Sequence, residues 1–328
     1  MAPSSRKLQV KWPEKLKPGS MVALVAPAFG FDPEALAQGS SYLESKYGVR
    51  TTALENVNQR FSYFAGTDER RLEELLFWLT NPEVDAVFAI RGGYGCARIY
   101  PKLIEKLKKH KRLKPKKVLG YSDLTILLNG LYQDLGWVTY HGPVVASRPF
   151  RDPVSLEEMS FQTAMFTDEP LGAISDEQTR VMSEGRAKGR LVGGCLSLLV
   201  SSLGTSYEID TRDKILFIED VDERPFRLDR MTTHLLHSGK LDQVRGIVFG
   251  QMAHCEPPEL AKDSSQTKAI EAIEMALEPL LEKRQIPILY DFPAGHGKPQ
   301  LTFPIGCEVE LVADQARPEL VFLESGAR

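Results

Sequence analysis

The stretch Val118-Leu119-Gly120-Tyr121-Ser122-Asp123-Leu124-Thr125 joins a short buried strand to a helix and places a serine at the junction. The strand is expected over residues 117–119, and residues 123–134 carry apolar side chains at helical spacing: Leu124, Ile126, Leu127 and Leu131. A serine at such a turn can be held clear of the sheet, beside the first backbone N–H groups of the helix. That geometry suits a nucleophile with an oxyanion site next to it. The alternative is that Ser122 is simply a helix N-cap.

The segments around this junction alternate between short apolar strands and helices. Further strands are expected over residues 21–26, 50–54, 85–90 and 137–141, and further helices over residues 34–46, 68–79 and 100–109. Thr67 is a good N-cap for the helix that follows it. This alternation predicts a parallel sheet with helices on both faces, in which ligands bind beyond the carboxyl ends of the strands. Residues 92–95 and Ser122 both lie at that edge.

The pattern changes from about Arg151. Residues 151–188 are polar and irregular, as expected of a linker or covering arm. Strands then become more frequent, at 215–218, 246–251, 288–291, 308–312 and 320–323, with helices at 194–203, 227–238 and 267–283. The chain is therefore predicted to have an N-terminal α/β domain with the nucleophile (1–150), a linker (151–188) and a β-rich C-terminal domain (189–328).

Composition narrows the functional class. The chain has 328 residues, 42% of them hydrophobic and 26% charged, with a net charge of −3. These values are ordinary for a soluble protein and imply neither nucleic-acid nor membrane binding. The basic run at 106–117 is expected to be a solvated helix end and loop.

Neither a secretory signal nor a membrane span is expected, because residues 1–7 lead into no long apolar run and no apolar segment of about 20 residues occurs. Four widely spaced cysteines form no C-x-x-C pair, so we expect reduced thiols in a cytoplasmic protein rather than disulfides or a zinc site.

Three further groups of residues could carry chemistry. Gly92-Gly93-Tyr94-Gly95 resembles a phosphate loop but lacks the Lys-Ser/Thr that follows one, so close backbone approach to a bound group is the favoured interpretation. Glu219 ends a buried strand, from which a carboxylate can orient an imidazole. His296 lies in a loop of turn residues between two glycines, which is unlike a core histidine. The remaining histidines are less informative: a solvated face is favoured over a metal pair for His234 and His237, and His110, His141 and His254 have no evident partners.

Six sequence blocks together resemble the LD-carboxypeptidase family, which also includes the microcin-immunity peptidases. They are Ala65-Gly66-Thr67-Asp68-Glu69-Arg70, Ala89-Ile90-Arg91-Gly92-Gly93-Tyr94-Gly95, Gly120-Tyr121-Ser122-Asp123, Phe217-Ile218-Glu219-Asp220, Gly295-His296-Gly297 and Pro304-Ile305-Gly306. The resemblance implies a flavodoxin-like N-terminal domain, a smaller β-rich C-terminal domain, an active site between them and a homodimer. It also implies a Ser122–Glu219–His296 triad, with the backbone N–H groups of Gly93 and Asp123 as the oxyanion hole.

The expected activity is that of a cytoplasmic serine carboxypeptidase without metal or organic cofactor. It would remove a terminal D-amino acid from an L-centre in a peptidoglycan-derived tetrapeptide. One alternative is a peptidyl- or aminoacyl-nucleotide substrate, as in microcin immunity, and another is a non-catalytic binding module. Cys195 stands where the family commonly has Asn, close to the expected substrate side. Candidate substrate-binding residues are Arg91, Tyr94, Arg98 and Arg227, although each arginine could instead pair with a nearby carboxylate.

Overall fold

The computed structural model describes residues 8–110, 113–257 and 267–328. Its first half contains β1 (Met21–Val25), α1 (Pro33–Tyr47), β2 (Arg50–Thr52), α2 (Asp68–Thr80), β3 (Ala86–Ala89), α3 (Cys96–Leu107), β4 (Lys117–Gly120), the 3-10 turn η1 (Ser122–Leu124), α4 (Thr125–Leu135), β5 (Thr139–His141) and the 3-10 turn η2 (Arg148–Phe150). The second half contains α5 (Ser155–Phe166), β6 (Gly172–Ile174), β7 (Arg180–Ser183), β8 (Gly185–Cys195), α6 (Leu196–Ser201), β9 (Lys214–Val221), α7 (Pro225–His237), β10 (Gly246–Ala253), α8 (Ala269–Leu281), β11 (Ile288–Tyr290), β12 (Phe303–Ile305), β13 (Glu308–Ala313) and β14 (Glu319–Phe322).

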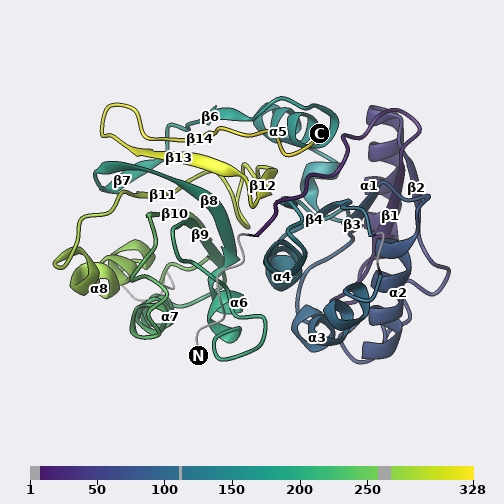
Figure 1. The fold of residues 1–328 in the computed structure, drawn as a ribbon, viewed down its shortest axis with the longest axis horizontal. Coiled ribbons are helices and arrows are strands. Elements are labelled where there is room, and N and C mark those ends of the chain that lie inside the picture. Colours follow the sequence, from purple (N-terminus) through teal and green to yellow (C-terminus); the bar gives the residue numbers. More distant parts are fainter. Residues whose placement is uncertain (1–7, 111–112, 258–266) are drawn as a thin grey trace.

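Two sheets form the framework of the molecule (Figure 1). The first has the strand order β12-β5-β4-β3-β1-β2, in which β1 to β5 are all parallel and β12 pairs antiparallel with β5. The order 2-1-3-4-5 of its parallel strands is that of flavodoxin-like folds, as expected from the sequence. Strand β12 comes from the far end of the chain, so this sheet is completed by a segment that follows both Glu219 and His296.

The second sheet is larger and mixed. Its order is β6-β14-β13-β8-β9-β10-β11-β7, with parallel pairing from β8 to β11 and antiparallel strands on both sides. Helices α7 and α8 lie together on one side of it (Figure 1). The predicted β-rich C-terminal half is therefore confirmed. The boundaries predicted for the three segments, at residues 150 and 188, stay a prediction.

Buried apolar strands hold the nucleophile side of the molecule in place. Every residue of β3 and β4 is buried. One face of the first sheet packs on apolar side chains from α2, α3 and α4, and the other packs on side chains from α1 and α5. Because a parallel sheet covered on both faces has only its strand ends accessible, the loops after β3 and β4 become the available edge for a ligand.

Two sequence expectations are wrong. Residues 151–188 are not irregular, since they contain α5, β6, β7 and the start of β8. The basic run is not uniformly solvated either. Lys116 and Lys117 are buried, and Lys117 Nζ donates to Tyr140 Oη at 2.7 Å and to the carbonyl of Ala164 in α5 at 2.8 Å. Burial lowers the pKa of Lys117 to about 7. Residues 111–112 of that run, and residues 1–7, on which part of the signal-peptide expectation rests, lie outside the described residues.

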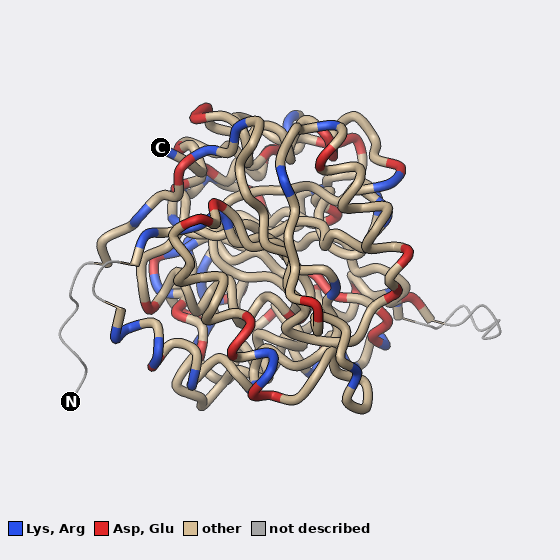
Figure 2. Tube along the Cα trace, turned by 90° about the vertical axis from the view of Figure 1, so that its right-hand side faces the viewer, with Lys and Arg blue, Asp and Glu red and all other residues tan. Residues whose placement is uncertain are grey.

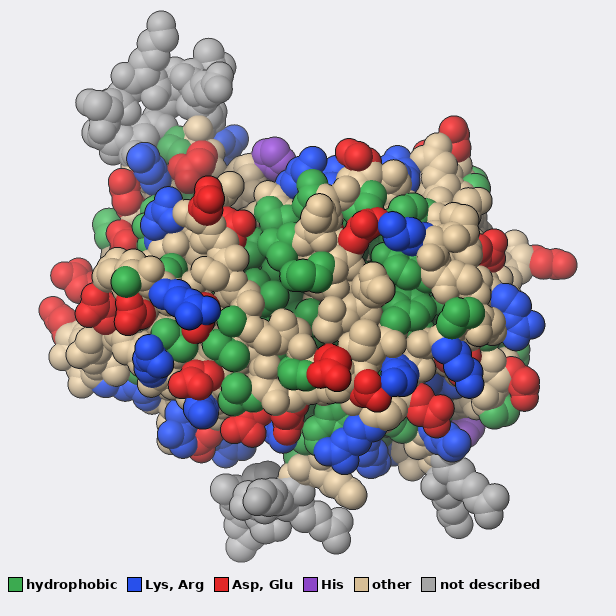
Figure 3. All heavy atoms as spheres, turned by 90° about the horizontal axis from the view of Figure 1, so that it is seen from above, with side chains coloured by type: hydrophobic (Ala, Val, Ile, Leu, Met, Phe, Trp, Pro, Cys, Tyr) green, Lys and Arg blue, Asp and Glu red, His purple; other side chains and the backbone are tan. Residues whose placement is uncertain are grey.

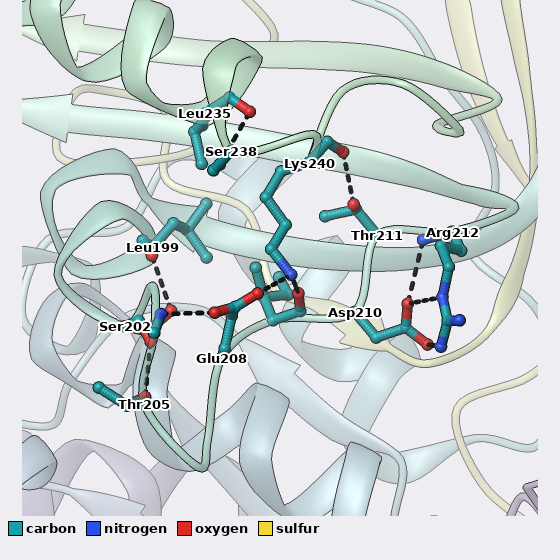
Figure 4. A network of polar contacts seen from close by, with 12 residues as sticks. Leu199, Ser202, Thr205, Glu208, Asp210, Thr211, Arg212, Leu235, Ser238 and Lys240 are labelled. Carbon is teal, nitrogen blue, oxygen red and sulfur yellow. Dashed lines mark hydrogen bonds and ion pairs between the residues drawn. The ribbon is translucent and has the colours of Figure 1, made fainter. Parts of the chain in front are cut away.

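Many polar contacts outside the sheets join segments that are far apart in the chain, such as Lys15 with Asp168 and Gln300 with Glu157. Figure 4 shows one network in which Lys240, after α7, pairs with Glu208 and donates to the carbonyl of Ile209 at 2.8 Å. Basic and acidic residues are interspersed along the described chain in Figure 2, in keeping with the small net charge. In Figure 3 hydrophobic side chains gather near the middle of one face, with charged side chains of both signs around them.

No helix in the described part of the chain combines the length and apolarity that crossing a bilayer requires.

Candidate active site

Ser122 lies in a strained turn between β4 and α4. It begins η1 with a φ of 59°, a left-handed value that is uncommon for a residue other than glycine. Such strain clusters at functional sites and is typical of a nucleophile at a strand–turn–helix junction. The N-cap alternative is wrong, because Leu124 occupies the N-cap position of α4 and no side chain bonds to the first turn there. The Ser122 hydroxyl is thus not engaged in capping.

The glycine loop between β3 and α3 packs directly against this turn. A Cβ added to Gly92 would lie 2.9 Å from Cβ and 3.1 Å from Oγ of Ser122, so a side chain here would crowd the serine. Gly93 has a φ of 116°, and a Cβ added to it would clash with the ring of Phe29. Within the described residues, the N–H groups of Gly93 and Asp123 donate to no other backbone group. Asp123 directly follows Ser122, and Gly93 follows the glycine that packs against the serine turn.

Glu219 and His296 form a carboxylate–imidazole pair. The carboxylate comes from β9 and the imidazole from the loop before β12, and Nδ1 of His296 lies 2.6 Å from Oε2 of Glu219. The Glu219 side chain is 0% exposed and that of His296 is 12% exposed. Burial alone would lower the pKa of His296, but the charge of Glu219 and its hydrogen bond raise it above its ordinary value. A neutral imidazole held in this way carries its proton on Nδ1 and leaves Nε2 as the acceptor.

The glycine before His296 allows this contact. Gly295 has a φ of 126°, and a Cβ added to it would lie 2.9 Å from Oε2 of Glu219. The loop is held to β10, where Gln251 N–H donates to the carbonyl of Ala294 at 2.9 Å. The glycine spacing that set His296 apart in the sequence therefore has a structural cause: the backbone must approach the carboxylate closely.

Tyr121 connects the serine side of the site to the histidine side. Its ring centroid lies 4.6 Å from that of His296, and Tyr121 directly precedes Ser122. The structure therefore pairs Glu219 with His296 and places the residue before Ser122 against the same imidazole. No hydrogen bond joins Ser122 Oγ to His296 among the described residues, and catalytic hydrogen bonds of this type often tighten only when substrate binds.

His141 is a neighbour of the site that the sequence reasoning left without a partner. It is fully buried at the end of β5, with its ring stacked on Phe303 at 5.0 Å and edge-on to Phe217 at 5.0 Å. Burial lowers the pKa of His141 to about 4, so the ring is neutral at pH 7. The sequence signal that could have identified His141 was its position at the carboxyl end of a predicted strand. In the structure it pairs in register with Gly120.

Cys195 and Asp220 lie behind the carboxylate–imidazole pair. Cys195 pairs in register with Glu219, and its Sγ lies 3.4 Å from Oδ1 of Asp220. Asp220 accepts the backbone N–H of Ser197 at 2.8 Å, and burial raises the pKa of Asp220 to about 6. The residue that departs from the family pattern thus borders the candidate site, although Cys195 itself is buried.

The predicted substrate-binding residues differ in their partners. Arg98 pairs with Asp68 at 2.7 Å, and Arg227 pairs with Glu223 at 3.3 Å. Arg91 instead donates to the carbonyl of Gly30 at 2.7 Å, and its guanidinium pairs with no carboxylate in the described parts of the chain. Tyr94, on the same loop, is 40% exposed.

The charge of Arg91 also acts on Tyr121, the residue before the serine. Burial raises the pKa of the Tyr121 phenol, and the charge of Arg91 opposes that shift. Tyr121 in turn packs against His296.

Metal ligation has little support from the side chains. Among the residues that the structure describes, no group of three His, Cys, Asp or Glu side chains is arranged to hold a metal ion. His234 and His237 both lie in the last turn of α7.

A strained serine beside two available N–H groups, with a buried carboxylate–imidazole pair next to it, is the arrangement of a serine hydrolase. Family models described as the LD-carboxypeptidase N-terminal domain and the LD-carboxypeptidase C-terminal domain match residues 22–142 and 188–311. The chain therefore belongs to the LD-carboxypeptidase family and is a hydrolase of the carboxypeptidase type.

Individual relatives agree with this assignment. The chain is 35% identical over 306 residues to a probable murein peptide carboxypeptidase of Bacillus subtilis, covering 91% of both chains. Its fold is similar to that of the muramoyltetrapeptide carboxypeptidase of Oxalobacter formigenes, with a TM-score of 0.78, 27% identity, and coverage of 93% of this chain and 99% of the other. The microcin C7 self-immunity protein MccF has the same fold, with a TM-score of 0.82 and 21% identity. The match covers 97% of this chain and 99% of MccF. The non-catalytic alternative is thereby excluded.

Proposed function

We propose that the chain removes the C-terminal D-amino acid from murein-derived tetrapeptides, with Ser122, Glu219 and His296 as its catalytic triad. The observation that carries the proposal is the buried 2.6 Å contact between Glu219 and His296 beside the strained turn of Ser122. The names of the Bacillus and Oxalobacter relatives support the substrate.

The proposed chemistry is acyl transfer to serine. Ser122 Oγ attacks the carbonyl carbon of the scissile peptide bond and passes its proton to Nε2 of His296, while Glu219 stabilises the imidazolium through Nδ1–H. The N–H groups of Gly93 and Asp123 bind the oxyanion. Collapse of the tetrahedral intermediate breaks the C–N bond, and His296 returns the proton to the leaving amine. Water, activated by the same imidazole, then hydrolyses the ester on Ser122.

Arg91 is the side chain that we propose for the free carboxylate of the departing residue. Carboxypeptidases must bind this group, and a guanidinium does so with charge-assisted hydrogen bonds. Arg98 and Arg227 already hold Asp68 and Glu223, which makes them less available. Tyr94 adjoins Arg91 on the glycine loop and remains a predicted contact for the same part of the substrate.

One experiment tests the activity directly. Purified protein is incubated with a muropeptide tetrapeptide, and the masses of the products are measured by mass spectrometry. Loss of one alanine residue, and no loss from the Ser122→Ala variant, is the expected result. An intact tetrapeptide, under conditions where the protein is folded by circular dichroism, would contradict the proposed substrate.

The microcin-type alternative predicts a different substrate and gains no support from the aromatic residues. A tryptophan in a loop of the second half would favour nucleotide stacking. The chain's three tryptophans lie in the first half, with Trp78 and Trp137 buried in the core and Trp12 packed under the guanidinium of Arg328. Cleavage of a peptidyl-nucleotide, with the tetrapeptide left intact, would favour this alternative.

We also propose a cytoplasmic location and a homodimeric state, as the family resemblance implied. All four cysteines are free and buried, in keeping with a reducing compartment. Light scattering coupled to size-exclusion chromatography tests the oligomeric state: a mass near twice that of the chain is expected. Fractionation of the source cells tests the location.

A further inference from the structure

Asp123 contributes two separate groups beside Ser122. Its backbone N–H is one of the two proposed oxyanion donors, and its carboxylate points away toward the glycine loop. That carboxylate is 0% exposed, and its Oδ2 accepts the backbone N–H of Cys96 at 2.8 Å. Cys96 is the first residue of α3, and the N-cap residue Gly95 has no side chain with which to cap it. Asp123 therefore supplies, from a different element, the cap that the glycine loop lacks.

This contact is the short hydrogen bond that joins the glycine loop to the serine turn. The other backbone hydrogen bonds of the loop are longer, at 3.3 Å from Phe29 N–H to the carbonyl of Gly92 and 3.2 Å from Arg98 N–H to that of Gly95. Burial raises the pKa of Asp123, while the Cys96 N–H and the charge of the buried Arg71 oppose that shift. Oδ2 of the carboxylate is thus held by the Cys96 N–H, while Oδ1 is buried without a hydrogen-bond partner among the described residues.

We propose that Asp123 is a positioning residue whose carboxylate sets the distance between the two N–H groups of the oxyanion hole. The backbone of Asp123 provides one of these N–H groups, and its carboxylate holds the loop that carries the other, that of Gly93. Gly93 lies three residues before Cys96, and a Cβ added to Gly92 would lie 2.9 Å from Cβ of Ser122. A loop of three glycines is otherwise conformationally permissive. The inference rests on the proposed function, since it concerns the oxyanion hole of that reaction.

The consequence is specific to the transition state. Oxyanion donors act only when charge develops on the substrate oxygen, so misplacing one lowers kcat and leaves ground-state binding largely intact. A purely structural cap would instead lower the melting temperature and reduce activity only through the fraction of folded protein. These two roles are separable by measurement.

The test compares Asp123→Ala, Asp123→Asn and a control, Glu271→Ala. Glu271 accepts the Lys268 N–H at 2.9 Å at the start of α8, so its loss removes a helix cap far from the site. Three quantities are measured at a temperature where every variant is folded: kcat and KM for the tetrapeptide, the rate with 4-nitrophenyl acetate, and the affinity for a peptidyl boronic acid, which forms a tetrahedral adduct with serine. Substrate affinity is measured separately in the Ser122→Ala background.

Asp123→Ala is expected to lower kcat and boronic acid affinity by about 100-fold or more, with substrate affinity changed by less than about threefold. Asp123→Asn, whose Oδ1 still accepts the Cys96 N–H, should stay within about tenfold of the wild type. The inference would be overturned if Asp123→Ala and Glu271→Ala lowered kcat equally. It would also be overturned if Asp123→Ala weakened substrate binding as much as boronic acid binding. If the wild type cleaves the acetate ester but no tetrapeptide, the proposed substrate is wrong, and the ester and boronic acid comparisons still decide the role of Asp123.

Discussion

Replacing Glu219 by Gln is expected to lower kcat/KM by about 10³- to 10⁴-fold, or about 4–5.5 kcal/mol. Oε2 accepts Nδ1–H at 2.6 Å, and the side chain is 0% exposed, so water cannot take its place. Glutamine keeps the size of the side chain but loses the charge that stabilises the imidazolium. Its amide group can also donate to Nδ1, which selects the tautomer with no lone pair on Nε2. The loss should be smaller than that from removing the nucleophile.

The same substitution should move the pH profile in a defined direction. Activity rises with pH as His296 loses its proton and becomes able to accept that of Ser122. Glu219 raises the pKa of His296 against the opposing effect of burial. Without that charge burial dominates, and the acid limb of the residual activity moves to lower pH.

The assay is kcat/KM for the tetrapeptide from about pH 4.5 to 8, with products weighed by mass spectrometry and folding checked by circular dichroism. The matched control is Glu310→Gln, which makes the same chemical change at a carboxylate of β13 that pairs with Lys188 at 3.4 Å. Retention of more than about a tenth of the activity, or an unmoved acid limb, would refute Glu219 as the partner of His296.

Three other predictions concern the nucleophile, the carboxylate of the substrate and the buried Lys117. Ser122→Ala should lower kcat by about 10⁴- to 10⁶-fold while substrate affinity, measured by calorimetry, changes little; more than about a tenth of the activity remaining would exclude Ser122 as nucleophile. A tetrapeptide with an amidated C-terminus should be cleaved about 10- to 150-fold less efficiently than the free acid, and equal rates would point to an endopeptidase or amidase instead. Because burial lowers the pKa of Lys117 to about 7, unfolding near pH 8 takes up a proton there. The stability of the wild type relative to Lys117→Met should therefore increase between about pH 7 and 9, and urea unfolding that shows no such increase would contradict the neutral state of this lysine.

The local pattern of the sequence was sufficient for the elements nearest the chemistry. The strand before Ser122 and the helix after it are continuous in the chain, so apolar spacing alone predicted the turn that holds the serine. The glycines around His296 likewise marked a loop, unlike the apolar helix face on which a core histidine packs. Glu219 was predicted at the end of a buried strand and lies within β9, which continues to Val221. Its assignment as the partner of His296 came from the family resemblance.

Other features depended on contacts between segments far apart in the chain. Residues 151–188 are locally polar, yet α5 is held by the first sheet, where Lys117 donates to the carbonyl of Ala164. A run of lysines is ordinarily solvated. Lys117 is buried because the phenol of Tyr140 and the carbonyl of Ala164 accept hydrogen bonds from it in the core. Neither partner can be recognised from the residues next to Lys117 in the sequence.

The amino-acid sequence by itself determined the fold class and the family, because both depend on residue types at fixed local spacings, and the proposed triad follows from the family resemblance. The tertiary structure decided which of these groups meet. It paired Arg98 with Asp68, directed the Arg91 guanidinium to the carbonyl of Gly30, packed His141 against Phe217 and Phe303, and directed the Asp123 carboxylate to Cys96. The physical reason is that hydrogen bonds and ion pairs act over a few ångströms in space, whereas their partners here are separated by tens of residues along the chain.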